Sequence, residues 1–272
     1  MAGNKQVKHK AVFLVFSLWI FIFLAIFCLS LGFRTYISVR KTKLVLNRVR
    51  AQGLAVSGVN IARSILTQTD LTCVNAGQDW AREITESIKF NSPPQEGFLR
   101  IIITDESSRI NINIAPKVLL EKIFKGLDLS DSLMKVDSFL YYISENVKNE
   151  PLAILEEITL AENITYEDYK KIKDFFTTFV DDAKVNVNTA TPELLEMIVD
   201  SPSTKTLISS PRFGSNPGYF QENELSSMTE VDLLKASSNC FRVMSEANVG
   251  GVIKKITCVL KLGSGIIYWH EE

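Results

Sequence analysis

The sequence opens with an apolar segment that constrains every fold the chain could adopt. Ala11 to Phe33 contains no charged residue, AVFLVFSLWIFIFLAIFCLSLGF, and a helix of about 20 apolar residues is long enough to cross the hydrocarbon core of a bilayer. The run is longer than the apolar part of a typical cleaved secretory signal, and no A-x-A cleavage site closes it. We therefore expect residues 12–33 to form a retained transmembrane helix in a lipid bilayer.

The segment after the apolar run keeps the periodicity of a helix. From Val39 to Leu66 apolar residues recur near helical spacing with basic and polar residues between them, and no proline lies between Ala11 and Leu66. Gly53 and Gly58 each lower helix stability by about 1 kcal/mol relative to alanine without ending a helix. A single long helix, half in lipid and half in water, is therefore expected.

Charge is distributed unevenly along the chain. Residues 1–50 contain nine Lys and Arg and no Asp or Glu, whereas residues 51–272 contain 21 Lys and Arg against 31 Asp and Glu, a net charge of −10. An acidic surface repels phosphate backbones, so nucleic acid is not an expected partner. Six basic residues follow the apolar run closely and three precede it, which by the positive-inside rule favours a cytoplasmic C-terminal side. The nine are Lys5, Lys8, Lys10, Arg34, Arg40, Lys41, Lys43, Arg48 and Arg50.

Beyond the long helix, the pattern changes towards strands. Asp79–Phe90 is expected to be a second helical stretch, closed by the Ser-Pro-Pro that follows it. Gly97–Ile103 is rich in β-branched residues and Arg109–Ile114 alternates, so the two are expected to pair as a β-hairpin across a polar turn.

A helical block and a second group of strands complete the chain. Residues 116 to about 199 have a mostly helical pattern, and residues 201–218, rich in Ser, Pro and Gly, predict a loop. Strands are expected again at Asn239–Val243, Val252–Leu262 and Ile266–His270. This order of elements indicates an α+β fold with an all-helical insertion.

Two segments of the chain echo one another. NINIAPKVLLEKI (Asn111–Ile123) and NVNTATPELLEMI (Asn186–Ile198) share the Asn pair, an alanine two residues further on, and Leu-Leu-Glu-x-Ile. In the second copy Thr191 is placed to cap a helix, Pro192 suits the first helical position, and Glu193 complements the helix dipole. Physical chemistry alone leaves two readings open: two well-made helix starts, or a functional element.

The functional reading is a helix-hairpin-helix-like element. Its DNA-binding form uses bare glycine amides that meet phosphate at a helix N-terminus. Residues 198–203 contain no glycine, and Asp200 would face the phosphate, so that form is disfavoured. A membrane-anchored DNA-binding protein of a DNA-uptake system is kept as the alternative function. The element comprises Asn186, Asn188, Thr189, Ala190, Pro192, Leu194 and Leu195.

Five stretches, together with the basic leader and the apolar helix, form an ordered set that spans nearly the whole chain. The five are residues 105–113 (DESSRININ), Glu157-Ile158 with Tyr169, residues 185–190 (VNVNTA), residues 237–243 (SSNCFRV) and residues 267–270 (IYWH). Taken in order, these segments resemble the type II secretion system protein K family, the minor pseudopilins at the tip of the pseudopilus.

The resemblance implies a pilin-like α+β fold: a long N-terminal transmembrane helix packed on an antiparallel sheet, with an inserted all-helical (helix-hairpin-helix-like) domain and no catalysis. The expected divisions are a leader at 1–11, the transmembrane helix at 12–33, and the helix continuation with the first strands at 34–115. The inserted domain is expected at 116–235 and the closing strands at 236–272.

The resemblance also implies a location and a set of partners. It places the chain in the bacterial inner membrane as a single-pass protein with a cytoplasmic N-terminus and a periplasmic C-terminal domain, against the charge count. Expected partners are other minor pseudopilins, the major pseudopilin, the inner-membrane assembly platform and a prepilin peptidase. The implied role is to initiate pseudopilus assembly for export of folded proteins across the outer membrane.

Three positions near the N-terminus carry expectations on processing and on place in the fibre that follow from this resemblance. Cleavage by the prepilin peptidase is expected between Ala11 and Val12, although pilin precursors usually have glycine where Ala11 stands. Major pilins carry a Glu at the fifth mature residue that pairs with the N-terminal amine of the subunit above. Counted from Val12, that position is Phe16, and a subunit without the carboxylate suits the tip.

Metal, cofactor and catalytic chemistry are not expected. Between Tyr142 and Glu157 the chain is too short and too poor in Asp for the family's calcium site. The only histidines, His9 and His270, lie near the two ends of the chain, and no Gly-rich phosphate loop or G-x-S-x-G is present. We predict no catalytic residues, no metal and no cofactor.

Two cysteines flank a predicted hairpin. Cys240 and Cys258 each lie nine positions from Val249, so a hairpin centred there would put them directly opposite one another. An oxidising periplasm would allow a disulfide. The alternative is two small buried residues of the sheet, because a slip of one residue separates the side chains onto opposite faces.

Overall fold

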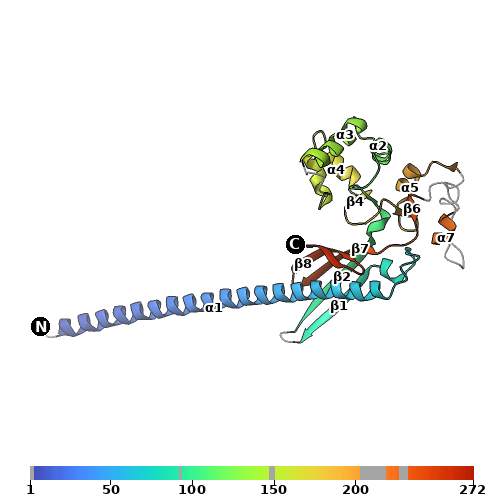
Figure 1. Ribbon diagram of the computed structural model, residues 1–272. Coiled ribbons are helices and arrows are strands. Elements are labelled where there is room, and N and C mark those ends of the chain that lie inside the picture. The colour runs from blue at the N-terminus through green and yellow to red at the C-terminus, as the bar shows by residue number, and fades with distance from the viewer. Residues whose placement is uncertain (1–2, 92–93, 147–150, 203–218, 227–231) are drawn as a thin grey trace.

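The computed structural model describes residues 3–91, 94–146, 151–202, 219–226 and 232–272. Its largest element is α1 (Gly3–Thr67), one continuous helix, as the sequence predicts. Figure 1 shows the N-terminal half of α1 projecting away from the rest of the molecule, while its C-terminal half lies along a sheet.

The sheet has five strands in the order β1-β2-β7-β8-β9, each antiparallel to its neighbours. They are β1 (Ile84–Asn91), β2 (Pro94–Asp105), β7 (Cys240–Val249), β8 (Val252–Lys261) and β9 (Gly265–Glu271). The three C-terminal strands expected from the sequence are therefore confirmed, with β7 running six residues further than predicted.

Small residues on one side of α1 let the helix lie close to the sheet. Ala51, Ala55 and Ala62 are completely buried. Gly58 permits the closest approach, since an added Cβ there would lie 2.9 Å from Leu99 Cδ1. The hydroxyl of Ser245 on β7 donates a hydrogen bond to the carbonyl of Ala55 at 2.8 Å, which fixes the helix against the strand. This contact sets the depth of the core between α1 and the sheet.

The predicted helix at Asp79–Phe90 is wrong. Asp79–Ala81 forms a single 3-10 turn, and the rest of the stretch is β1, paired with β2 along its whole length. Ile84 and Ile88 are four residues apart, a spacing that places them on one face of a helix and equally on one face of a strand. The partner strand decides between the two, because β2 offers a complete ladder of hydrogen bonds.

The predicted hairpin of Gly97–Ile103 with Arg109–Ile114 is also wrong. β2 pairs with β1 and β7, whereas β3 (Ile110–Asn111) leaves the sheet and pairs in parallel with β4 (Phe176–Thr177). Between them lies a 3-10 turn whose Asp105 side chain accepts from Ser107 N at 2.8 Å. The turn redirects the chain out of the sheet instead of reversing it.

The segment between β2 and β7 builds a second hydrophobic core. It is formed by buried residues from Ile110 to Ala236, with Phe124, Phe139 and Phe176 among the largest. The expected helical block therefore contains short parallel strand pairs as well as helices, and the predicted loop falls largely on residues 203–218, outside the described part. The remaining elements are α2 (Lys117–Gly126), α3 (Ser132–Tyr141), α4 (Tyr166–Ile172), β5 (Val185–Asn186), α5 (Pro192–Ile198), α7 (Glu222–Leu225) and β6 (Leu234–Lys235).

The inserted segment lies at the end of the sheet away from the N-terminus of α1 (Figure 1). It leaves β2 after Asp105 and returns to β7 at Cys240, and these ends are adjacent because Asp105 pairs with Phe241. Neighbouring strands of one antiparallel ladder therefore carry the whole insertion, and the sheet keeps its register around it.

Candidate functional site

The N-terminal half of α1 exposes its apolar side chains. Within Phe13–Thr67 an 18-residue window has mean hydropathy 2.8 and is 0% buried, so the helix is long and apolar enough to cross a membrane by length and composition. Phe16 is 63% exposed. Ala11 and Val12 lie within α1, where their side chains are not described, so cleavage between them stays a prediction.

The two copies of the sequence echo fold in the same way. In each, the first asparagine is the last residue of a two-residue strand in a parallel pair, β3 with β4 and β5 with β6. Ile112 N donates to Thr177 O at 3.0 Å in the first copy. At the same place in the second copy, Val187 N donates to Lys235 O at 3.0 Å. The echo is thus a repeated structural unit, in which a short strand leads through an Asn-x-Asn turn into a helix.

The second asparagine of each copy brackets the backbone of a distant residue. Asn113 Nδ2 donates to Leu152 O at 3.1 Å, and Asn113 Oδ1 accepts from Leu152 N at 2.8 Å. Asn188 makes the same two bonds with Phe220, at 2.9 and 2.8 Å. An amide side chain supplies one donor and one acceptor side by side, which matches a backbone N–H and C=O of one residue.

The first asparagine of each copy has a different partner. Asn111 Nδ2 donates to Val180 O inside the inserted segment. Asn186, which is 0% exposed, donates instead to Val74 O at 3.0 Å and to Asp105 Oδ2 at 2.8 Å. Only the second copy is therefore tied by this asparagine to the end of β2.

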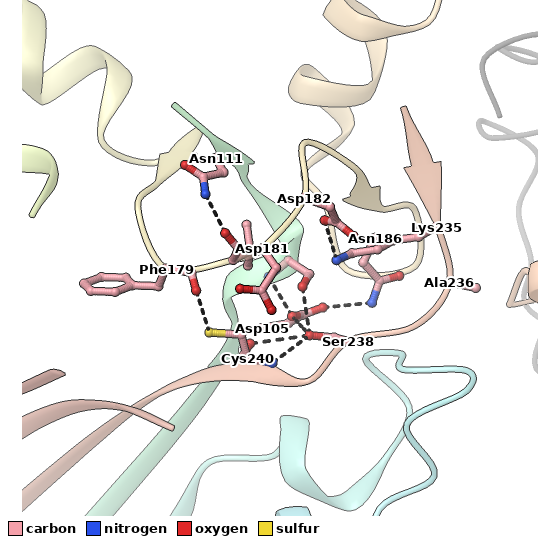
Figure 2. A network of polar contacts seen from close by, with 12 residues as sticks. Asp105, Asn111, Phe179, Asp181, Asp182, Asn186, Lys235, Ala236, Ser238 and Cys240 are labelled. Carbon is pink, nitrogen blue, oxygen red and sulfur yellow. Dashed lines mark hydrogen bonds and ion pairs between the residues drawn. The ribbon is translucent and has the colours of Figure 1, made fainter. Parts of the chain in front are cut away.

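Asp105 accepts hydrogen bonds that join the inserted segment to the sheet, as Figure 2 shows. Its carboxylate accepts from Ser107 N at 2.8 Å, Ser238 Oγ at 2.6 Å, Thr189 Oγ1 at 2.7 Å and Asn186 Nδ2. Burial raises the pKa of Asp105 above its ordinary value, although its hydrogen-bond donors act against the rise. Four donors converging on one buried carboxylate fix the place where the chain leaves and rejoins the sheet.

Glu106, the next residue, holds a second junction contact. Its side chain is fully buried and is engaged by Arg242 Nε from β7, by Arg109 NH1 at 3.5 Å and by the hydroxyl of Thr177. Burial alone would raise the pKa of Glu106, but Arg242 and Arg109 hold it below its ordinary value. Asp105 and Glu106 thus point to different partners from adjacent positions.

A loop of the inserted segment lies against the other face of the sheet. Val180 packs with Cys240 and Val259, and the ring of Phe179 lies 5.4 Å from that of Tyr268 on β9. Figure 2 shows the backbone carbonyl of Phe179 facing the thiol of Cys240, which donates to it at 3.6 Å. The junction therefore combines the buried carboxylates with an apolar contact on one face of the sheet.

A cavity of about 150 Å³ opens where the inserted segment meets the sheet. Arg109, Tyr169, Arg242 and Tyr268 are among its lining residues. Burial, together with the adjacent Glu156, raises the pKa of Tyr169, whose hydroxyl donates to Glu156 at 2.6 Å. Within the described ranges, no three of His, Cys, Asp and Glu lie close enough together to hold a metal ion; the expectation of no calcium site stays a prediction.

The helix-hairpin-helix-like element has the helix start that the sequence predicts. Leu194 N donates to Thr191 Oγ1 at 3.3 Å, Pro192 begins α5, and Leu194 and Leu195 are buried. Ala190 N donates to Asn186 O at 2.9 Å, so this amide is used inside the turn. Residues 203–218 lie outside the described part. The function of the element stays a prediction.

The predicted alignment of Cys240 with Cys258 is wrong. Val249 pairs with Val252 around the turn at Gly250 and Gly251, and this register places Cys240 opposite Lys261 and Cys258 opposite Val243. The two thiols lie on opposite faces of the sheet and are free. The turn requires two consecutive residues with positive φ, which two glycines supply without strain, so the hairpin centre lies beyond Val249.

Sequence reasoning did not anticipate the burial of the junction. From the sequence, Asp105 and Glu106 are only the start of the segment 105–113, and Ser238 and Arg242 only part of the segment 237–243. One signal was present: the two acids follow the apolar run Ile101–Ile103 after a single residue, Thr104, so they continue a buried strand where unpaired carboxylates would be costly. Apart from Ser107 and Arg109, their partners come from more than 70 residues away and could not be identified from local pattern.

Comparison with known proteins gives structural likenesses but no sequence match. No protein-family model matches the chain, and no curated protein sequence matches it. Among solved structures, the chain is similar to one chain of the GspK-GspI-GspJ complex from the enterotoxigenic Escherichia coli type 2 secretion system. The TM-score is 0.68 at 15% identity, over 85% of this chain and 99% of that chain. A likeness at this identity shows the fold: a long N-terminal apolar helix on an antiparallel sheet with additional helices, the pilin-like class expected from the sequence.

Proposed function

We propose that this chain is a minor pseudopilin at the tip of a type II secretion pseudopilus, where it initiates pseudopilus assembly for export of folded proteins across the outer membrane. In this proposal α1 anchors the protein by a single pass in the bacterial inner membrane, with the N-terminus in the cytoplasm and the sheet and inserted domain in the periplasm. Residues 1–11 are the leader, and residues 116–235 the inserted domain.

One observation carries the proposal: an exposed apolar helix is continuous with the helix that packs on the sheet. The apolar window of α1 is 0% buried, and exposed apolar area of this extent requires a bilayer or other apolar helices. A rigid helix joining a membrane to a folded domain is what a fibre subunit needs, because extraction from the bilayer into a helical bundle keeps the apolar surface covered. The likeness to a chain of the GspK-GspI-GspJ complex supports other minor pseudopilins as partners.

The proposed further partners are the major pseudopilin, the inner-membrane assembly platform and a prepilin peptidase. Phe16 supports a tip position, because a subunit with phenylalanine at the fifth mature residue offers no carboxylate to the amine of a subunit above it. The inserted domain supports the same position. It lies at the end of the sheet away from the N-terminus (Figure 1), where it would obstruct a subunit stacked beyond it.

The alternative, DNA binding in an uptake system, is not favoured. Asn186 and Asn188 direct their side chains to backbone and carboxylate partners within the protein. The polar groups of this turn are therefore engaged inside the fold. Retention of double-stranded DNA by the full-length protein at physiological salt would reverse this assessment.

Two measurements test the proposal. Intact-mass analysis of the membrane-extracted protein should show a chain beginning at Val12; a mature chain still beginning at Met1 would contradict processing as a pseudopilin. Phe16→Glu should alter assembly initiation or admit the subunit into the fibre interior, whereas Phe23→Glu, the same change at an exposed position of the same helix, should not reproduce the effect. Identical behaviour of the two variants would remove the support that Phe16 gives to a position at the tip of the pseudopilus.

A further inference from the structure

A row of basic residues lies on α1 between the apolar window and the sheet. Arg34, Lys41 and Arg48 follow one another at intervals of seven, and all three are exposed. Seven residues advance a helix by almost two full turns, so the three lie on one side of α1. Across the described residues, the ion pairs include none of them. The first acidic residue of the chain is Asp70, beyond the end of α1.

Beside this row runs a stripe of small and apolar side chains. Thr35, Ser38, Thr42, Val45 and Val49 alternate in steps of three and four, and all five are exposed. These are the a and d positions of a heptad in which the basic row occupies the g positions. The stripe ends at Gln52, which bonds to Glu271 of β9 at 2.9 Å. We define the five residues as the α1 seam.

Two polar residues of the seam, Thr35 and Thr42, form their side-chain hydrogen bonds within α1. The hydroxyl of Thr35 donates to Leu31 O at 2.9 Å, and that of Thr42 donates to Ser38 O at 3.0 Å. Their hydrogen bonds are satisfied within α1, and side chains of this size allow a second helix to approach closely.

Lipid head groups account for only the first of the three basic residues. Head groups extend about 5–7 Å beyond the hydrocarbon core on each side. Arg34 adjoins the apolar run, but Lys41 and Arg48 lie about 10 Å and 21 Å further along the helix axis at about 1.5 Å per residue. Arg48 therefore stands well beyond the layer that anionic lipids could occupy.

A second copy of this chain also fails as the partner. In a parallel pair of helices, g positions face the e positions of the following heptad on the partner helix. The e positions of this chain are Val39, Leu46 and Gly53, and no acidic residue is present anywhere on α1. In two copies, each basic row would thus face the uncharged e positions of the other helix without forming an ion pair.

We infer that the α1 seam is the docking surface for a parallel, membrane-anchored helix of a different chain that carries acidic residues at heptad spacing, and that Arg34, Lys41 and Arg48 select it. The inference rests on the proposed function for the parallel orientation, because both chains enter from the same membrane. Charge decides the choice of partner, and the small seam residues decide how closely it packs.

The same segment provides a matched control. Arg40 and Lys43 are exposed basic residues at the f and b positions of the heptad, away from the seam. Lys41→Glu/Arg48→Glu and Arg40→Glu/Lys43→Glu make the same change in net charge within nine residues of one another. A general electrostatic or lipid effect would change binding in both double variants, whereas an effect of the α1 seam would change it only in Lys41→Glu/Arg48→Glu.

The experiment uses the full-length chain with a benzophenone amino acid at Val45, expressed in its native membrane and photolysed there. We expect a cross-link to a different membrane-anchored chain, reduced about tenfold by Lys41→Glu/Arg48→Glu and unchanged by Arg40→Glu/Lys43→Glu. Exchange of an acidic residue of the captured chain for lysine should restore the cross-link in the first variant.

Three results would overturn the inference: no protein cross-link at Val45, a cross-link to a second copy of this chain, or equal losses in the two double variants. The proposed function is judged separately. Capture of a helix with heptad-spaced acids from a chain without a pilin-like fold would keep the seam and reject the pseudopilin. Capture of a pilin-like partner to the same extent in all variants would support the pseudopilin and reject the seam.

Discussion

Replacement of Asn113 by alanine tests whether the Asn-x-Asn turns hold distant segments of the inserted domain in place. The change removes one donor and one acceptor at once, because Asn113 bonds to both the carbonyl and the amide of Leu152, at 3.1 and 2.8 Å. Nothing else in the side chain contributes a polar contact that alanine would have to replace. The substitution therefore removes contacts with a single residue, Leu152, which lies 39 positions from Asn113.

The magnitude follows from the two backbone groups that lose their partner. A buried donor or acceptor without a hydrogen bond costs about 1–3 kcal/mol. These two bonds are only partly buried, so water reaches them in the variant and the lower end applies to each. A total of about 2 kcal/mol corresponds to roughly 30-fold faster exchange of the Leu152 amide hydrogen through local opening.

Hydrogen exchange followed by mass spectrometry on the full-length protein in mild detergent measures this directly. The peptide containing Leu152 should exchange roughly 30-fold faster in Asn113→Ala, while the peptide containing Phe220 stays unchanged. In Asn188→Ala the peptide containing Phe220 should exchange faster, and the peptide containing Leu152 should stay unchanged. The acceleration should be smaller, because Cys73 Sγ also donates to Phe220 O at 3.5 Å. Asn60→Ala, at an exposed site on α1, is the control. Equal acceleration of both peptides in either variant would refute the reasoning, since it would indicate global and not local loosening.

Further predictions concern the helix–sheet contact, the junction and the thiols. Gly58→Ala should lower the free energy of unfolding by about 1–3 kcal/mol, because the added Cβ would displace Ser245 and crowd Leu99. Gly53→Ala, where an added Cβ meets nothing within 4 Å, should raise it by about 1 kcal/mol. If urea unfolding gave changes of the same sign for both variants, the close approach of α1 to the sheet at Gly58 would be contradicted. Glu106→Gln should cost about 3 kcal/mol by leaving the guanidinium of Arg242 without its buried carboxylate. Because the pKa of Glu106 is lowered in the folded protein, the wild type should lose this stabilisation as pH falls through that value, and the variant should lack that part of the acid unfolding curve. Burial raises the pKa of Cys240 to about 12 and of Cys258 to about 11, so iodoacetamide at pH 8 should label both only after unfolding; a disulfide in a non-reduced digest would disprove the register.

The features predictable from sequence were those fixed by residues close together in the chain. The uninterrupted helix of α1, the cap at Thr191 with Pro192 after it, and the three closing strands all depend on local pattern, and all are present. The similarity of the two Asn-x-Asn segments was equally visible, because a duplicated local unit repeats its own signals. Even there, Leu152 and Phe220, the partners of Asn113 and Asn188, lie 39 and 32 residues away. No local feature of the sequence indicated them.

The errors arose where a distant partner decided between two local solutions. Ile84 and Ile88 fit a helix and a strand equally, and β2 selected the strand. Placement of the β7–β8 turn at Gly250-Gly251 shifted the register by enough to put the two cysteines on opposite faces, although both strands had been located correctly. A strand can be predicted from its own residues, but its register requires knowledge of the turn.

The junction explains how a sheet can carry so large an insertion without losing its order. The chain departs from Asp105 and returns next to it at Phe241, so the two crossing segments already lie at hydrogen-bonding distance before any inserted residue is considered. Ser238, on the returning segment, donates to the carboxylate of Asp105 on the departing one, and Asn186 and Thr189 from the inserted domain donate to the same group. Any rotation of the inserted domain against the sheet would have to break several of these bonds at once and expose a buried carboxylate, which costs more than the loss of a single surface contact. The inserted domain and the long helix should therefore move as one body, so that a force applied along α1 reaches the far end of the molecule.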